Sequence, residues 1–342
     1  MELSNNSNIK VTRIGGDKLS DLFVSVKNSL QQVEKKKIVF PEATDERVLR
    51  AASRLAQDGY VNPILIGNIT EINALAQKEN IHISTCTLID PKSYADMDEM
   101  IQAFVERRNG KVSNEEAKPI LEDENYFGTM LVHLNIADGL VSGAAHSTSD
   151  TVRPALQLIK TKEGIQKTSG VFVMVRGEEK YIFADCAINI APTSEDLAEI
   201  AVESAKTATL FDVIPRIAML SFSTKGSARS EETEKVIEAM QLAKEKDAGL
   251  VIDGELQFDA AFVPEVAAKK APQSEVKGNA TVFVFPSLEA GNIGYKLTER
   301  LGGFEAVGPI LQGLNKPVND LSRGCSEEDV YKLALITAAQ SL

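Results

Sequence analysis

The 342-residue chain has little cysteine and little histidine, and neither type is spaced as in common metal or disulfide frameworks. Its three cysteines, Cys86, Cys186 and Cys325, are odd in number and far apart, so the sequence indicates no disulfide framework. The three histidines belong to no H-E-x-x-H pattern, and there is no C-x-x-C pair. We therefore expect no metal site.

Long apolar runs are also missing. No window approaches the roughly 18 consecutive apolar residues that suggest a membrane-spanning helix, and the polar N-terminus lacks the apolar core of a signal peptide. The net charge of -12 disfavours nucleic acid or an anionic membrane as the main partner. We expect a reduced, cytoplasmic protein without membrane or nucleic-acid partners.

Two nucleotide-binding fingerprints are absent as well: there is no G-x-G-x-x-G after the first strand and no G-x-x-x-x-G-K-[ST]. A phosphate site would have to be built from arginine, lysine and backbone N–H groups, against the negative charge of the whole chain. Hydrophobic residues (43%) and charged residues (25%) are present in ordinary globular proportions. The length suggests two domains, at about 150 residues each.

What the chain does contain is an alternation of apolar runs and amphipathic stretches. It predicts helices at 19–37, 44–56 and 69–78 and strands at 37–41 and 62–67, with a third strand region within 82–90. This order is typical of a parallel, doubly wound α/β sheet. Two strands at 171–175 and 181–185 form a predicted hairpin at the entry to a second domain, and 259–270 is a predicted helix.

Near the C-terminus, Ser326 and Asp329 have capping-box spacing and predict a helix that starts just after Cys325. Ser322 and Arg323 would then lie at the positive end of that helix, where an anion is favoured. Arginine adds a planar fork that suits two phosphate oxygens. On spacing alone, Asp329 as a simple helix cap is the better interpretation.

Two other stretches allow both a structural and a functional interpretation. The loop 143–150 contains small residues, then Ser147 and Thr148, which could cap the next helix or donate to an anion. His146 in that loop is interpreted as a hydrogen-bonding spacer. The run 291–296 is expected to open a helix, with glycines that permit close approach of a ligand.

The stretch K-P-V-N-D-L-S-R-G-C-S at 316–326 resembles the C-terminal signature of phosphate acetyltransferases. Supporting matches are D-C-A-I-N at 185–189, D-G-E-L-Q-F-D-A-A at 253–261 and G-N-I-G-Y-K at 291–296. The similarity extends from V-F-P-E-A at 39–43 to the C-terminus. Single blocks also occur in phosphate butyryltransferases and in the last domain of some malic enzymes.

This resemblance implies two doubly wound α/β domains that face each other across a cleft, similar to isocitrate and isopropylmalate dehydrogenases. Residues 1–162 plus 315–342 would form the first domain and carry the Ser-Arg-Gly motif, and 163–314 would form the second. The implied reaction is reversible acetyl transfer between acetyl phosphate and coenzyme A. It needs no cofactor, since coenzyme A is a substrate, and a homodimer is the expected assembly.

The resemblance also implies roles for individual residues. Asp329 would take the thiol proton of coenzyme A, Arg323 would hold the phosphate and Ser322 would stabilise the developing oxyanion. The sequence leaves open whether Asp329 removes the proton or only orients the thiol, because a helix N-terminus stabilises an ionised carboxylate. One substrate-binding position would be Arg107, for which the adjacent Arg108 is the alternative. The other positions would be Arg153, Ser147, Thr148, Asn292, Lys296 and Arg300.

Cys325 is predicted not to be a nucleophile, although its place beside a helix start favours a thiolate. Coenzyme A carries its own thiol, so direct attack needs one acyl transfer where a covalent route needs two. Two other functions stay open. One is phosphate butyryl transfer, and the other is a module that binds an acyl phosphate without turnover.

Overall fold

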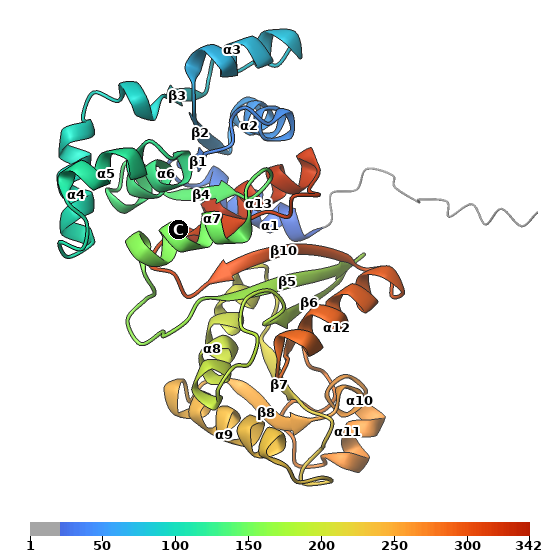
Figure 1. Cartoon of the computed structure of the whole chain (residues 1–342). Coiled ribbons are helices and arrows are strands. Elements are labelled where there is room, and N and C mark those ends of the chain that lie inside the picture. Colours follow the sequence, from blue (N-terminus) through green and yellow to red (C-terminus); the bar gives the residue numbers. More distant parts are fainter. Residues whose placement is uncertain (1–20) are drawn as a thin grey trace, which may run out of the picture.

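The computed structural model describes residues 21–342, and its strands form two separate sheets (Figure 1). The first sheet has the order β11-β4-β1-β2-β3, and every neighbouring pair is parallel. Its strands are β1 (Lys36–Phe40), β2 (Val61–Ile66), β3 (Thr87–Ile89), β4 (Gly139–Ser142) and β11 (Val318–Asp320). The parallel sheet predicted from the alternating pattern is confirmed.

Helices cover both faces of the first sheet. Ile38 and Phe40 pack into one apolar cluster with α1 (Asp21–Gln31), α2 (Glu46–Asp58) and α13 (Glu327–Gln340), whereas Val39 packs on the other face against α6 (Glu124–His133). This alternation follows from the two-residue period of a strand. The remaining elements of this half are α3 (Ile69–Lys78), η1 (Pro91–Ser93), α4 (Met97–Arg107), α5 (Asn114–Leu121), α7 (Thr148–Pro154) and the π-helix η2 (Ala155–Ile159).

The second sheet has the order β10-β5-β6-β9-β7-β8, and β5 is antiparallel to both of its neighbours. The hairpin predicted at this point is therefore confirmed. The strands are β5 (Ser169–Arg176), β6 (Glu179–Ala184), β7 (Arg216–Leu220), β8 (Val251–Leu256), β9 (Val282–Val284) and β10 (Glu305–Gln312). Helices α8 (Ser194–Leu210) and α9 (Glu231–Lys246) cover one face, and α10 (Phe258–Phe262), α11 (Pro264–Lys270) and α12 (Leu288–Arg300) cover the other.

The chain crosses between the two sheets twice, and the crossings lie side by side. Thr161 and Leu314 form an isolated antiparallel bridge, and Lys162 N–H donates to the Gly313 carbonyl at 2.9 Å. The exact domain limits and the dehydrogenase-like arrangement stay predictions. Within residues 21–342, no helix combines the length and apolar character that crossing a membrane requires.

Three local predictions need correction. The helix predicted at 19–37 ends at Gln31, and its first two residues lie outside the described residues. The helix predicted at 259–270 is broken at Val263, because the residue before Pro264 is pushed out of the helical conformation. Strand β11 was not predicted, since three residues are too few to show a strand period.

Candidate active site

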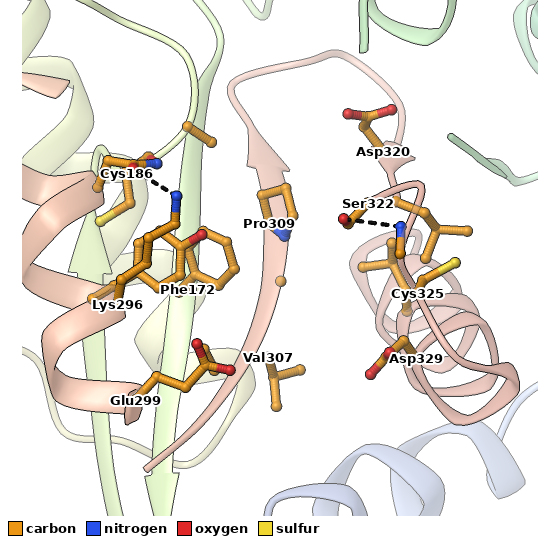
Figure 2. A pocket seen from close by; sticks show the side chains of 18 of the residues that line it. Phe172, Cys186, Lys296, Glu299, Val307, Pro309, Asp320, Ser322, Cys325 and Asp329 are labelled. Atoms are coloured by element: carbon orange, nitrogen blue, oxygen red, sulfur yellow. Dashed lines mark hydrogen bonds between the residues drawn. The ribbon is translucent and has the colours of Figure 1, made fainter. Parts of the chain in front are cut away.

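A cavity of about 700 Å³ opens between the two sheets, at the carboxyl ends of β4 and β11. Figure 2 shows Ser322, Cys325 and Asp329 on one side of it, opposite Lys296 and Glu299 of α12, with Pro309 of β10 between them. Parallel α/β sheets place ligands at the carboxyl ends of their strands. The polar residues that line the cavity are His146, Thr148, Asn292, Tyr295, Lys296, Glu299, Arg300, Glu305, Asp320, Ser322, Arg323, Asp329 and Lys332.

The motif loop after β11 ends in the predicted capping box. Ser326 donates to Asp329 Oδ2 from both its N–H and its hydroxyl, each at 2.8 Å, and Asp329 N–H donates to Ser326 Oγ at 3.2 Å. Ser322 Oγ accepts the N–H of Gly324 at 3.3 Å, so its own O–H stays available for a ligand. Both the structural and the functional interpretation of Asp329 are therefore compatible, because this cap also lines the cavity.

Arg323 is the most available cation of the cavity. Four basic and four acidic side chains line it, so net charge does not make it an anion site. Two of these cations are paired, Arg300 with Glu299 at 3.3 Å and Lys332 with Glu305 at 2.6 Å. The exposed Arg323 guanidinium has no ion-pair partner among residues 21–342, which leaves its fork free for a phosphate.

The loop after β4 already binds an anion, and the chain itself supplies it. The buried carboxylate of Glu42 accepts the N–H groups of Ala144, Ala145 and His146, each at 2.8 Å. Glu42 Oε1 also lies 2.8 Å from Nδ1 of His146. A buried carboxylate needs such partners to offset its lost hydration. The backbone donors of this loop are thus occupied, and His146 is held in a fixed orientation.

Thr148 joins this loop to the motif loop. Its hydroxyl donates to Asp320 Oδ2 at 2.6 Å, and Leu321 N–H donates to the Ser142 carbonyl at 2.7 Å. The other oxygen of Asp320, Oδ1, is buried without a hydrogen-bond partner. Burial raises the pKa of Asp320 to about 6, which places a titrating group in the cavity wall near neutral pH.

Arg47 links the same two loops through hydrogen bonds, and the sequence analysis did not predict this role. Its Nη1 donates to the carbonyls of Arg323 and Cys325 at 2.9 and 2.8 Å, and its Nη2 donates to the Ala144 carbonyl at 2.8 Å. Asp45 holds the guanidinium in place and caps α2. The available signal was position, since Glu42, Asp45 and Arg47 all follow the carboxyl end of β1.

Cys325 is a buried thiol rather than an exposed one. Burial raises its pKa to about 11, although Arg47, whose Nη1 lies 3.7 Å from the sulfur, acts in the opposite direction. The helix N-terminus and the nearby arginine suggested a thiolate, but loss of hydration has the larger effect. That Cys325 is not a nucleophile stays a prediction.

The glycine run 291–296 lies inside α12 rather than at its start, which corrects the prediction of a helix opening there. A Cβ on Gly291 would lie 2.2 Å from the Asp185 carbonyl oxygen, so this glycine permits tight packing of the helix and not approach of a ligand. The helix still directs the predicted residues Asn292, Lys296 and Arg300 to the cavity, and Lys296 Nζ donates to Asn292 Oδ1 at 2.9 Å.

Three predicted binding residues do not line the cavity. Arg107 donates to the carbonyls of Leu158 and Ile159 at 2.6 and 3.0 Å and so closes the end of η2. Arg153 is exposed on α7, and Ser147 donates to Asp150 Oδ2 at 2.7 Å in a capping box. Within the described part of the chain, no group of three or more His, Cys, Asp or Glu side chains is placed to hold a metal ion.

Comparisons with known proteins agree with the motif. The family model described as phosphate acetyl/butaryl transferase matches residues 22–338. A phosphate acetyltransferase of Bacillus subtilis is 67% identical over 95% of this chain and 100% of that protein. A phosphotransacetylase structure from Streptococcus pyogenes is 58% identical, with a TM-score of 0.92 over 95% of this chain and 99% of that one. A branched-chain phosphotransacylase from Enterococcus faecalis, at 18% identity and a TM-score of 0.63 over 90% of this chain and 99% of that one, shows the same fold.

Proposed function

The chain belongs to the phosphate acetyl/butaryl transferase family, and we propose that it transfers an acetyl group reversibly between acetyl phosphate and coenzyme A. The observation that carries this proposal is the cavity itself. Its lining includes the unpaired guanidinium of Arg323, the Ser322 hydroxyl, Asp329 and the cations of α12. No cofactor enters the reaction, because coenzyme A is a substrate.

The proposed transfer is direct, within a ternary complex. Arg323 holds the phosphoryl group through two oxygens, and Ser322, whose oxygen already accepts from Gly324, donates a hydrogen bond to the developing oxyanion. Lys296 and Arg300 face this loop across the cavity and contact coenzyme A. Asp329 either orients the thiol or takes its proton. The cavity's volume of about 700 Å³ and its lining by both the motif loop and α12 support this proposal, because direct attack requires both substrates to be bound side by side.

The test is an assay of thioester formation from coenzyme A and a panel of acyl phosphates. Acetyl phosphate should be the better substrate by kcat/KM. A preference for butyryl phosphate would make the chain a butyryltransferase. Binding of acetyl phosphate without any thioester would make it a non-catalytic module. Arg323, which has no ion-pair partner among residues 21–342, would alone suffice for such a module, but the presence of Ser322 and Asp329 in the same cavity favours catalysis.

The proposed assembly is a homodimer. The apolar face of α13 is buried in the core of the chain itself, so it cannot serve as the interface. Exposed apolar side chains in the second half of the chain, such as Ile190 and Phe222, offer an alternative surface. Light scattering at micromolar concentration should give twice the mass of the chain, and a monomer would contradict the proposal.

A further inference from the structure

Strand β10 contains a bulge where it passes the cavity. Its antiparallel pairing with β5 is interrupted between Val307 and Ile310. The two residues of the bulge, Gly308 and Pro309, together face the single residue Phe172 of β5. A bulge redirects side chains away from the regular pleat, and proline is tolerated there because its nitrogen donates no ladder hydrogen bond. Pro309 is half-buried and lines the cavity.

The bulge is packed tightly against β5, so it cannot retract from the cavity. A Cβ on Gly308, whose φ is +149°, would lie 2.7 Å from the Val171 carbonyl oxygen and 2.9 Å from Cδ1 of Phe172. Only glycine fits at this point of the strand. Phe172 is itself held by stacking on Tyr295 of α12, with ring centroids 4.0 Å apart. The ring of Pro309 is therefore a fixed part of the cavity wall.

Contacts on both sides of the bulge fix its position relative to the motif loop. Leu311 N–H donates to Oδ1 of Asn319 in β11 at 2.8 Å. At the other end of β10, the ion pair of Glu305 joins the strand to α13. Figure 2 shows Pro309 opposite Ser322, whose hydroxyl oxygen points toward it. The width of the space between the proline ring and Ser322 is set by these contacts.

Pro309 also differs from the other apolar side chains near the motif loop. Leu321, Cys325 and Leu333 line the cavity from the motif side, but all three are buried and present little surface to a ligand. Val307 of β10 is buried as well. The half-buried proline ring is thus the apolar surface that faces Ser322.

We infer that the ring of Pro309 contacts the methyl group of bound acetyl phosphate and limits the length of the acyl chain that the enzyme accepts. The inference rests on the proposed function. With the phosphoryl group on Arg323 and the acyl carbonyl oxygen on Ser322, the rest of the acyl group extends across the space toward Pro309. A methyl group fits there. A butyryl group has two more methylenes, which the fixed ring excludes.

The test is the ratio of kcat/KM for butyryl phosphate to kcat/KM for acetyl phosphate, each measured by thioester formation with coenzyme A. This ratio does not depend on the fraction of the enzyme that is folded. One methylene in an apolar pocket changes kcat/KM by roughly 10–200-fold, so the wild-type ratio should be ~0.01 or lower. Pro309→Ala removes two ring carbons and should raise the ratio at least ~10-fold.

Two further variants separate the volume of the ring from other effects of the substitution. Pro309→Val puts an apolar side chain of similar size in place of the ring but removes the constraint on the backbone. It should keep the ratio within about threefold of wild type, because the volume of the wall is conserved. Val307→Ala shortens a neighbouring side chain of β10 that lies nearer to Asp329 than to Ser322 in Figure 2, and it should leave the ratio unchanged.

Several results would overturn the inference while leaving the proposed function intact. One is a ratio in Pro309→Ala within about threefold of wild type. Another is an equal rise in Pro309→Ala and Pro309→Val, which would make the backbone and not the ring responsible. Equal use of both acyl phosphates by wild type, or an equal rise in Val307→Ala, would also count against a wall formed by Pro309.

A larger side chain gives an independent test if Pro309→Ala does not fold. Pro309→Leu should lower the ratio of kcat/KM for propionyl phosphate to that for acetyl phosphate at least ~10-fold, because it narrows the same space. An unchanged propionyl ratio would overturn the inference in the same way. A wild-type protein that forms no acetyl-CoA would instead reject the proposed function.

Discussion

Replacing Asp320 by Asn should change how the stability of the protein depends on pH. The side chain is 3% exposed, and only one of its two carboxylate oxygens accepts a hydrogen bond. Burial raises its pKa from 3.8 to about 6. The folded state therefore holds this proton more tightly than the unfolded chain does, and the contribution to stability is lost as pH rises from about 4 to about 6.

The size of the effect follows from the shift. About two pKa units at ~1.4 kcal/mol each give roughly 3 kcal/mol. Ionisation of Asp320 lowers the free energy of unfolding by this amount at pH 7, whereas at pH 3 the group is protonated and there is no such loss. The Asn side chain keeps an oxygen that can accept from Thr148 but does not ionise. The free energy of unfolding of Asp320→Asn, minus that of wild type, should therefore increase by about 3 kcal/mol over this interval.

Urea unfolding at a series of pH values measures this difference. Far-UV circular dichroism is the suitable signal, because the sequence has no tryptophan. Asp150→Asn is the control, since hydrogen bonds from Ser147 lower the pKa of Asp150. Removal of the Asp150 carboxylate should lower the free energy of unfolding more at neutral than at acidic pH. This pH dependence has the opposite sign to that expected for Asp320→Asn. A difference between Asp320→Asn and wild type that stays constant from pH 4 to 7 would refute the reasoning.

Two further substitutions test the phosphate contact and the packing of α12. Arg323→Lys keeps the charge but loses the planar fork, so kcat/KM for acetyl phosphate should fall roughly 100-fold with no change in melting temperature; an efficiency near wild type would remove Arg323 from phosphate binding. Gly291→Ala places a methyl group against the Asp185 carbonyl and should lower the free energy of unfolding by about 1–3 kcal/mol. Gly249→Ala, in an exposed turn, should have little effect, and equal stabilities of the two variants would count against the packing argument.

The parts of the fold that could be predicted are those whose signal is local. The capping box at Ser326 and Asp329 and the strand predicted at 37–41 depend on residues near in sequence, and both are confirmed. The edge strand β11 has three residues and is stabilised by pairing with β4, whose residues lie far back in the chain. No local pattern reports such a pairing.

The candidate site shows the same limit. The free arginine fork was predicted from its motif, but the anion bound by loop 143–148 was not, because Glu42 precedes that loop by about a hundred residues. The sequence suggested backbone donors and hydroxyls for a ligand. In the structure these donors are satisfied by Glu42, Asp150 and Asp320. A loop rich in hydrogen-bond donors indicates an anion site. Only the fold shows whether the anion is a ligand or a carboxylate of the chain itself.

The last prediction concerns Cys325, whose burial could not be predicted from its neighbours in the sequence. Its position between Arg323 and a helix start favours a thiolate, but burial of the sulfur raises its pKa to about 11 and keeps it protonated at neutral pH. Cys325→Ala should therefore keep kcat within about tenfold of wild type, with a small loss from the loop that Arg47 holds at the Cys325 carbonyl. Steady-state kinetics should give intersecting double-reciprocal lines, as for a ternary complex. Mass spectrometry after incubation with acetyl phosphate alone should show no adduct. Parallel lines together with an acetyl group on Cys325 would establish a covalent route, because only a two-step transfer through this sulfur produces both.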